Sequence, residues 1–174
     1  MSALEGFIRT IPDFPQPGIA FRDITPLLAD ARALNEAVTA MAGQATALGA
    51  DVVIGAEARG FLLGPALARE LDCGFAMARK PGKLPYATIS AAYALEYGTE
   101  SLELHDDAIS DGHRVLVHDD LLATGGTAQA VRELVEQSGG EVVGFSFLIE
   151  LEGLVGSERL SPLPVESLMR LEAG

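Results

Sequence analysis

Residues 115–128, VLVHDDLLATGGTA, form the most informative stretch of this chain. A short apolar run comes first, and two carboxylates, Asp119 and Asp120, follow it directly. A loop of small residues comes next, and residues 128–137 then repeat apolar side chains at helical spacing. This order predicts a strand, a loop and a helix. The carboxylates would then lie past the carboxyl end of the strand, where open α/β sheets bind their ligands.

The loop has the composition of an anion-binding turn. Gly125 and Gly126 allow a positive φ or a close approach of the backbone to a ligand. Thr127 is a favourable N-cap, and a helix beginning there would direct unpaired N–H groups into the loop. Those groups and the helix dipole suit a phosphate dianion. The alternative interpretation is an ordinary strand–helix turn that contains two aspartates by chance.

A second strand–loop–helix unit precedes this one. Residues 51–56 read as a buried strand, the loop EARG follows at 57–60, and residues 61–71 show a helical pattern. A second anion site at this loop is consistent with the pattern. The alternative is a solvated loop that carries a surface arginine.

Further strands are expected at residues 74–78, 141–150 and 166–171, and a further helix at 31–48. Alternating residues at 88–95 and 101–104 predict a β-hairpin. Together these elements predict a mostly parallel α/β sheet flanked by helices, in a single domain of 174 residues.

Charge restricts the classes of partner. The formal charge of −13 and the isoelectric point of about 4.5 argue against binding to nucleic acid or to anionic membranes. No apolar run reaches the length of a membrane span, and no signal peptide is evident. With one cysteine, Cys73, the chain is expected in the reducing cytoplasm. The densest basic cluster, Arg79, Lys80 and Lys83, falls in a Pro- and Gly-containing loop.

The stretch 115–128 resembles the ribose-phosphate signature of the type I phosphoribosyltransferases. The resemblance implies that Asp119 and Asp120 act in catalysis and hold the ribose of phosphoribosyl pyrophosphate (PRPP). It implies that the 5′-phosphate is bound by the loop that follows: Ala123, Thr124, Gly125, Gly126 and Thr127.

The N-terminal region resembles that of the members specific for adenine. There, DFPQPG at 13–18 and FRDITPLL at 21–28 look like the hood that covers the base. The resemblance implies that Phe21 stacks on adenine and that backbone groups of Ala20 and Arg22 read its polar edge. Leu151 would cover the base from the other side.

Two further loops match the same family. The form GAEARGF at 55–61 is close to the pyrophosphate loop, which implies a strained, cis peptide bond between Glu57 and Ala58. The implied pyrophosphate-binding residues are Glu57, Ala58, Arg59, Arg79, Lys80 and Lys83. Residues 95–100 resemble the mobile catalytic loop, so Glu96 and Tyr97 would close over the reacting centre. The hood would span about 1–30 and the flexible loop about 80–104.

The implied reaction is purine salvage, in which adenine and PRPP give AMP and pyrophosphate. The resemblance implies Mg²⁺ as cofactor, bound through pyrophosphate and water with no direct protein ligand, as suits an ion that keeps its waters. His105, His113 and His118 lack metal-ligand spacing. The resemblance also implies a homodimer. Two alternatives remain: a phosphoribosyltransferase for another purine, and a non-enzymatic regulator that senses PRPP.

Overall fold

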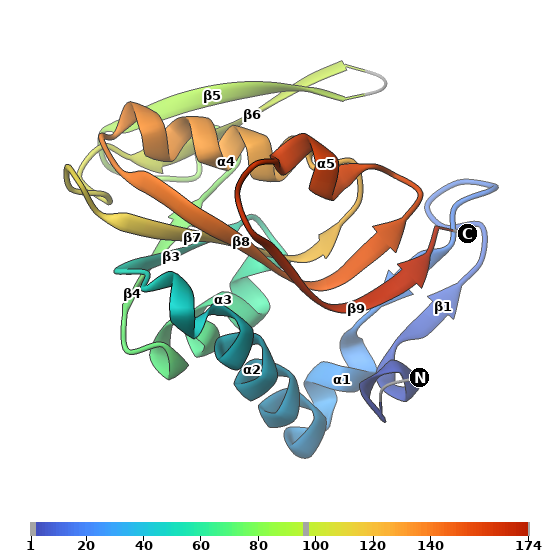
Figure 1. Ribbon diagram of the computed structural model, residues 1–174. Helices are drawn as coiled ribbons and strands as arrows, with labels where there is room; N and C mark the ends of the chain where they lie inside the picture. The colour runs from blue at the N-terminus through green and yellow to red at the C-terminus, as the bar shows by residue number, and fades with distance from the viewer. Residues whose placement is uncertain (1–2, 96–97, 174) are drawn as a thin grey trace.

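A five-stranded parallel sheet forms the centre of the molecule (Figure 1). The computed structural model describes residues 3–95 and 98–173, with side chains described outside residues 93–99. The strand order is β4-β3-β7-β8-β9, and every neighbouring pair is parallel. The strands are β3 (Val52–Ala56), β4 (Gly74–Ala78), β7 (Arg114–Leu122), β8 (Glu141–Glu152) and β9 (Val165–Glu172). The expected fold class is therefore confirmed.

Both faces of the sheet are covered, so its central strands are apolar throughout. Side chains alternate between the two faces along a strand. In β7, Val115 and Val117 join one core with Leu134, whereas Leu116 joins the other core with Leu63. All five are at most 1% exposed. This double burial explains why the strands appear in the sequence as continuous apolar runs.

Helices and a hairpin form the outer layers. Helices α2 (Ala31–Ala45) and α3 (Gly60–Glu70) pack against one face, and α4 (Gly126–Gln137) packs against the other. The hairpin of β5 (Thr88–Leu95) and β6 (Gly98–His105) lies over α4 (Figure 1). The remaining helices are α1 (Thr25–Ala29), α5 (Gly156–Leu160) and the 3-10 helices η1 (Ala3–Phe7) and η2 (Thr46–Leu48).

The N-terminal segment forms a small antiparallel ribbon beside the end of β9 (Figure 1). Its strands are β1 (Arg9–Ile11) and β2 (Phe21–Asp23). The Arg22 guanidinium donates hydrogen bonds to the Thr10 hydroxyl and to the Glu172 carbonyl. These two bonds attach the ribbon to the last strand of the sheet.

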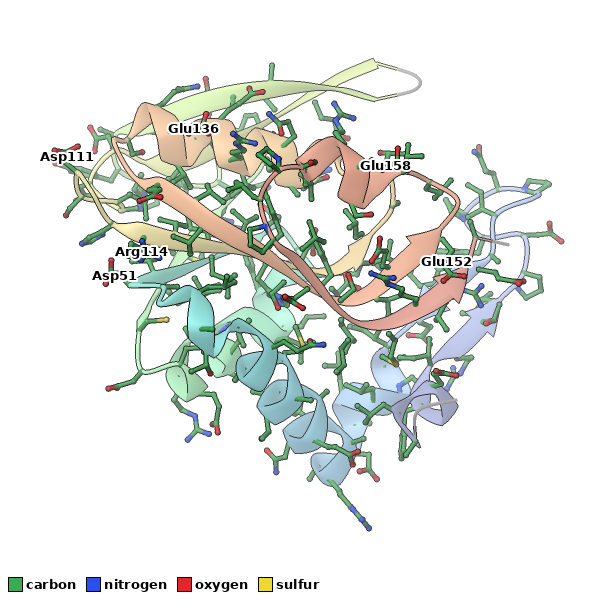
Figure 2. All side chains as sticks on the ribbon, viewed as in Figure 1. Asp51, Asp111, Arg114, Glu136, Glu152 and Glu158 are labelled. Atoms are coloured by element: carbon green, nitrogen blue, oxygen red, sulfur yellow. The ribbon has the colours of Figure 1, made fainter. Side chains whose placement is uncertain are left out.

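At the amino end of the sheet, polar side chains hydrogen-bond to the backbone of neighbouring segments. At the amino ends of β3 and β7, Asp51 and Arg114 lie together (Figure 2). The Arg114 guanidinium donates to the carbonyls of Leu48 (2.9 Å) and Gly49 (3.0 Å), and the Arg114 N–H donates to Asp51 (2.9 Å). These bonds tie the chain segment before β3 to the start of β7.

The helices that the structure describes include none long and apolar enough to cross a membrane.

The structure corrects three details of the expected elements. Strand β7 continues to Leu122, so Asp119 and Asp120 lie within the strand near its carboxyl end and not past it. Helix α4 begins at Gly126, and Gly125, not Thr127, occupies the N-cap position. The reason is conformational, because Gly125 has a left-handed φ of 78° that turns the chain into the helix. The hairpin strands also continue to Leu95 and from Gly98, so the connection between them is shorter than the 95–100 loop expected from sequence.

Candidate active site

A cavity of about 220 Å³ opens at the carboxyl end of β7. Asp119 lies at its edge, and Arg59 reaches it from the loop between β3 and α3. Its lining residues are Arg59, Asp119, Leu121, Leu122, Ala123, Thr124, Gly125, Gly126, Thr127, Ala128 and Phe147. Two strand–loop–helix units that are separate in sequence therefore contribute to one cavity, because β3 and β7 are neighbours in the sheet.

The first turn of α4 offers backbone donors to this cavity. No side chain caps the helix, so N–H groups at its start have no partner within the helix. The turn is fixed by close packing against the first residue of α5, Gly156. A Cβ atom on Gly125 would lie 3.0 Å from the Gly156 carbonyl oxygen, and one on Gly156 would lie 2.2 Å from the Ala123 oxygen. The loop therefore holds its donors in a defined position for an anion.

The acidic pair lies in a partly desolvated position. Asp120 is 1% exposed, and its carboxylate forms an ion pair with the Arg59 guanidinium at 3.2 Å. The Asp119 carboxylate accepts the Asp120 backbone N–H at 2.9 Å. Burial raises the pKa of both carboxyl groups, and for Asp119 the charge of Asp120 raises the pKa further. Arg59 acts in the opposite direction on the pKa of each carboxyl group.

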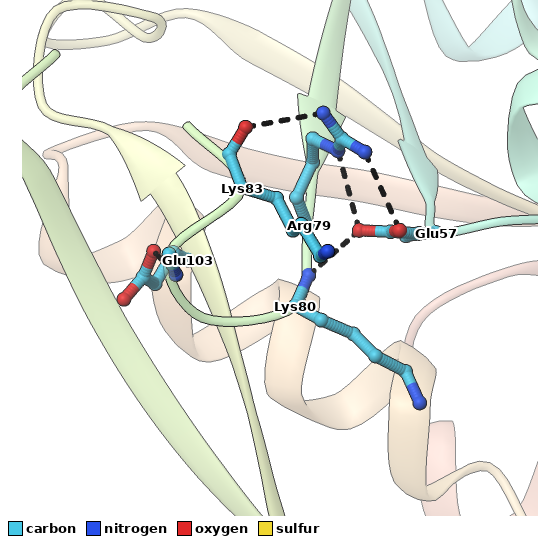
Figure 3. A network of polar contacts seen from close by, with 6 residues as sticks. Glu57, Arg79, Lys80, Lys83 and Glu103 are labelled. Atoms are coloured by element: carbon cyan, nitrogen blue, oxygen red, sulfur yellow. Dashed lines mark hydrogen bonds and ion pairs between the residues drawn. The ribbon is translucent and has the colours of Figure 1, made fainter. Parts of the chain in front are cut away.

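A second polar network surrounds the Glu57 carboxylate (Figure 3). Arg79 donates to it through Nε (3.2 Å) and through a terminal nitrogen (3.4 Å), and the Lys80 backbone N–H donates at 2.9 Å. Arg79 also donates to the Lys83 carbonyl at 3.1 Å. The bond from the Lys80 N–H is the largest cause that lowers the pKa of Glu57. Glu57 therefore ties the basic loop to the end of β3.

Arg59 also contacts the N-terminal ribbon. Its guanidinium carbon lies 5.1 Å from the centre of the Phe21 ring, within the range of a cation–π interaction. The Phe14 ring meets Phe21 at 79° with centroids 5.2 Å apart. Arg59 thus contacts both Phe21, the ring expected to stack on the base, and Asp120, one of the carboxylates expected to bind the ribose.

The remaining expected residues have different positions. The peptide bond between Glu57 and Ala58 is cis, as the sequence comparison implied. Leu151 lies on β8 and lines a separate cavity of about 260 Å³ with Glu150, Val155 and Arg170, among others. Glu96 and Tyr97 lie outside the described residues. Among the described residues, no group of three or more His, Cys, Asp or Glu could hold a metal ion.

The structure adds residues that the sequence did not single out. Phe147 of β8 lines the main cavity, and the side-chain stem of Arg159 lies 3.5 Å from the Cβ position of Gly125. Glu103 of β6 accepts the Gly82 N–H at 3.0 Å and so holds the basic loop from its other end. No local pattern marks these residues, because each meets a segment that is distant in the chain: Glu103 and Gly82 are 21 positions apart, and Phe147 and Arg159 meet the loop that precedes α4.

This fold is that of a phosphoribosyltransferase, as comparison with known proteins shows. The family described as "Phosphoribosyl transferase domain" matches residues 27–160, and the chain belongs to this family. A relative from Gloeobacter violaceus, named adenine phosphoribosyltransferase, is 56% identical over 92% of this chain and 94% of its own.

Solved structures point to the same branch of the family. The adenine phosphoribosyltransferase of Thermoanaerobacter pseudethanolicus superposes with a TM-score of 0.94 at 49% identity, covering 97% of this chain and 98% of its own. The Saccharomyces cerevisiae enzyme, solved with an imino-altritol bisphosphate and adenine, gives 0.90 at 37% identity over 95% and 96%. The particular relatives are therefore adenine phosphoribosyltransferases.

Proposed function

We propose that this protein transfers the phosphoribosyl group of PRPP to adenine, giving AMP and pyrophosphate in purine salvage. The observation that carries the proposal is the cavity of about 220 Å³, which brings together Asp119, the uncapped start of α4 and the Arg59 cation, with the buried Asp120 carboxylate paired to Arg59 behind its wall. A sugar phosphate needs those three kinds of group: donors for its phosphate, acceptors for its hydroxyls and a cation for its leaving group.

The loop from Ala123 to Thr127 would bind the 5′-phosphate. Its backbone N–H groups need no reorganisation, since Gly125 and Gly156 already fix the turn. With the phosphate held, the ribose is positioned over Asp119 and Asp120, which accept hydrogen bonds from its hydroxyls. Their negative charge would also stabilise the positive charge that develops on the sugar as the pyrophosphate leaves. Fixing both ends in this way orients the anomeric carbon toward the incoming base.

The pyrophosphate would be bound by cations from both neighbouring loops. Arg59, Arg79, Lys80 and Lys83 supply the charge, and the backbone of Glu57 and Ala58 borders the same region. The Glu57 carboxylate is occupied by Arg79 and the Lys80 N–H. We therefore assign Glu57 the task of orienting Arg79, because a carboxylate facing an anion would weaken binding by repulsion.

The base would be held at the N-terminal ribbon. Phe21 provides the stacking face, the backbone of Ala20 and Arg22 reads the polar edge, and Leu151 closes the opposite side. The Arg22 side chain is engaged with Thr10 and Glu172, so the base would meet the backbone of Arg22 and not its guanidinium. Adenine is favoured over other purines by the identity of 37–56% with enzymes named for it.

The residues fit a magnesium ion that arrives with the substrate. The Asp119 carboxylate borders the cavity, and the Oδ2 oxygen of the neighbouring Asp120 accepts no hydrogen bond, its one recorded partner being the ion pair with Arg59. Mg²⁺ prefers oxygen ligands, keeps several waters and requires few protein carboxylates. Asp119 and Asp120 would hold the ion through water while pyrophosphate binds it directly. When bound, it neutralises charge on the leaving pyrophosphate.

Glu96 and Tyr97 are proposed to close over the reacting centre. The N-terminal 30 residues would act as hood and residues 80–104 as the flexible segment. We also propose a homodimer in the cytoplasm. Support for the dimer comes from three large apolar side chains on consecutive segments: Leu62 (48% exposed), Met77 (42%) and Tyr86 (64%).

Incubation of the purified protein with Mg²⁺, PRPP and each purine base tests the proposal. AMP should form from adenine much faster than nucleotides form from guanine, hypoxanthine or xanthine. Preferential use of another purine would reassign the base. Tight PRPP binding without any nucleotide product would instead identify a PRPP-sensing regulator.

A further inference from the structure

We propose that Arg59 is a latch that keeps the base-stacking face of Phe21 covered until pyrophosphate draws the guanidinium away. This inference rests on the proposed function and deepens it. It assigns to one side chain the coupling between the leaving-group subsite and the base subsite. Arg59 is thus a positioning residue for adenine as well as a ligand of pyrophosphate.

One guanidinium lies against both subsites. It lies 5.1 Å from the centre of the Phe21 ring and 3.2 Å from the Asp120 carboxylate. The first position is where a flat base would stack, and the second is where ribose hydroxyls would bind. Arg59 also lines the cavity at the start of α4. No other described cation is recorded over the Phe21 ring or paired with Asp120.

The contacts of Arg59 with Asp120 and with the Phe21 ring hold its guanidinium in one position, but a pyrophosphate could replace both of them. Its side chain is 38% exposed, so solvent screens the ion pair, and the side chain has room to move. A cation over an exposed aromatic face is held weakly. A pyrophosphate carries several negative charges and accepts two hydrogen bonds from the planar guanidinium, whereas Asp120 offers one charge through one contact at 3.2 Å.

Pyrophosphate would therefore clear both subsites at once. As the guanidinium turns to the anion, the Phe21 face becomes available for adenine. The buried Asp120 carboxylate loses its cation at the same time, and the ribose hydroxyls of PRPP replace it as hydrogen-bond donors. Adenine that arrives first must displace Arg59 without any such compensation. The result is a positive coupling between the two ligands, which must be equal in both directions.

Adenine affinity measured with and without the separated parts of PRPP tests this coupling. Isothermal titration with adenine is performed on the protein alone, then at saturating Mg²⁺-pyrophosphate and ribose 5-phosphate. This mixture lacks the bond that reacts, so binding is observed without turnover. For the wild type we expect the adenine Kd to fall by about tenfold, within the usual range of such couplings.

Arg59→Gln should abolish the change in adenine affinity, because pyrophosphate does not attract an uncharged amide away from the Phe21 ring. We expect its adenine Kd to change less than about twofold on adding the same ligands. Arg79→Gln is the matched control: it removes one positive charge from the same subsite but does not touch the Phe21 ring. It should need more pyrophosphate for saturation and then show the full coupling.

Equal coupling in the wild type and in Arg59→Gln would overturn the latch, as would a wild type without coupling. If Arg59→Gln does not fold, Phe21→Leu tests the same point. It should bind adenine weakly and with an affinity that pyrophosphate no longer changes. Failure of the latch is separate from failure of the proposed function, since AMP formation by the wild type is measured independently. A wild type that forms no AMP from adenine and PRPP would overturn both.

Discussion

The loops after β3 and β7 belong to the same kind of strand–loop–helix unit, lie side by side and contribute opposite kinds of group to the cavity. After β7 the useful groups are backbone donors, presented by a glycine turn and an uncapped helix. After β3 they are side chains: Arg59 reaches into the cavity, and Glu57 fixes the basic loop. The same strand–loop–helix architecture can therefore bind a ligand through backbone groups in one loop and through side chains in another.

Packing explains the difference. The start of α3 is pressed against β7, so that a Cβ atom on Gly60 would lie 2.9 Å from the His118 carbonyl oxygen. One on Gly55 would lie 2.6 Å from the Gly60 oxygen. This close approach leaves little space for an anion at the start of α3, but it brings Arg59 within 3.2 Å of Asp120. The start of α4 instead borders the open cavity.

The largest expected effect comes from removing the charge of the acidic pair. Asp119→Asn and Asp120→Asn should each lower kcat/KM for PRPP by about 10²-fold, the value of one or two hydrogen bonds to a charged acceptor. The isosteric amides preserve packing, so the proteins should remain folded. Steady-state kinetics checks this, with exposed Asp106→Asn as the control. Unchanged kcat/KM in both variants would make the pair structural only.

The same variants should separate function from stability. Because burial raises the pKa of both carboxyl groups, the folded state binds more protons than the unfolded state above pH 3.8. The contribution of these two carboxyl groups to the stability of the wild type therefore decreases as pH rises through this window, opposite in sign to the contribution of His118. Asp119→Asn lacks the Asp119 part of this contribution and keeps that of His118, so its free energy of unfolding relative to wild type should increase from pH 4 to pH 7. Urea unfolding across that range measures the difference.

Gly125→Ala tests the backbone side of the comparison. The left-handed φ of 78° makes alanine unfavourable by about 1–2 kcal/mol. The added Cβ would also lie 3.0 Å from the Gly156 oxygen, so the phosphate loop must shift. We expect KM for PRPP to rise about tenfold or more, since small misplacements at such loops are costly. Gly112→Ala is the control.

Gly112 has a similar φ of 77° and no atom within 4 Å of its Cβ position. Its substitution should reduce stability by a comparable amount and leave KM unchanged. If both variants raised KM equally, the effect would come from general destabilisation and not from the phosphate loop.

Glu57→Gln tests the side-chain half and should have a smaller effect. Arg79 would keep its bond to the Lys83 carbonyl but lose its ionic partner, so it would be less well oriented. KM for PRPP should rise about three- to tenfold with little change in kcat, because the loss affects binding of ground state and transition state alike. Surface Glu70→Gln, whose partner is the neighbouring Arg69, is the control. A lower KM would show that Glu57 acts mainly by repelling the anion.

The sequence predicts the features that depend on local patterns and misses those that depend on contacts between distant segments. The parallel strands were predicted because double burial produces apolar runs such as residues 52–56. The start of α4 was misplaced because the capping preference of Thr127 is local. The conformation of Gly125 depends instead on Gly156, which lies far along the chain. The pairing of Arg59 with Asp120 joins two loops, so no local pattern could reveal it.

His118→Leu should affect activity least, although His118 directly precedes the acidic pair. The ring is fully buried, its Nδ1 lies 3.0 Å from the Ser146 carbonyl oxygen, and its Nε2 has no partner. It occupies the α3 side of β7, where a Cβ on Gly64 would lie 3.4 Å from its ring. Leucine has a similar volume and needs no partner. Activity at pH 7.5 should therefore stay within about twofold of wild type, since no contact with the cavity is lost.

Its signature should appear in the pH dependence of stability. Burial lowers the pKa of His118 to about 4, below its ordinary value of 6.5. As pH falls below 6.5, His118 becomes protonated in the unfolded chain but stays neutral in the folded protein. Its contribution to the stability of the wild type therefore decreases until about pH 4. The shift corresponds to about 3 kcal/mol, and His118→Leu should not lose this part. Urea unfolding from pH 7.5 to 4.5 measures the gap, with His113→Leu, at a partly exposed turn, controlling for loss of a histidine. Parallel curves for the wild type and His118→Leu would mean that the buried ring takes up its proton without penalty. The strand beneath the acidic pair would then be more hydrated than its packing indicates.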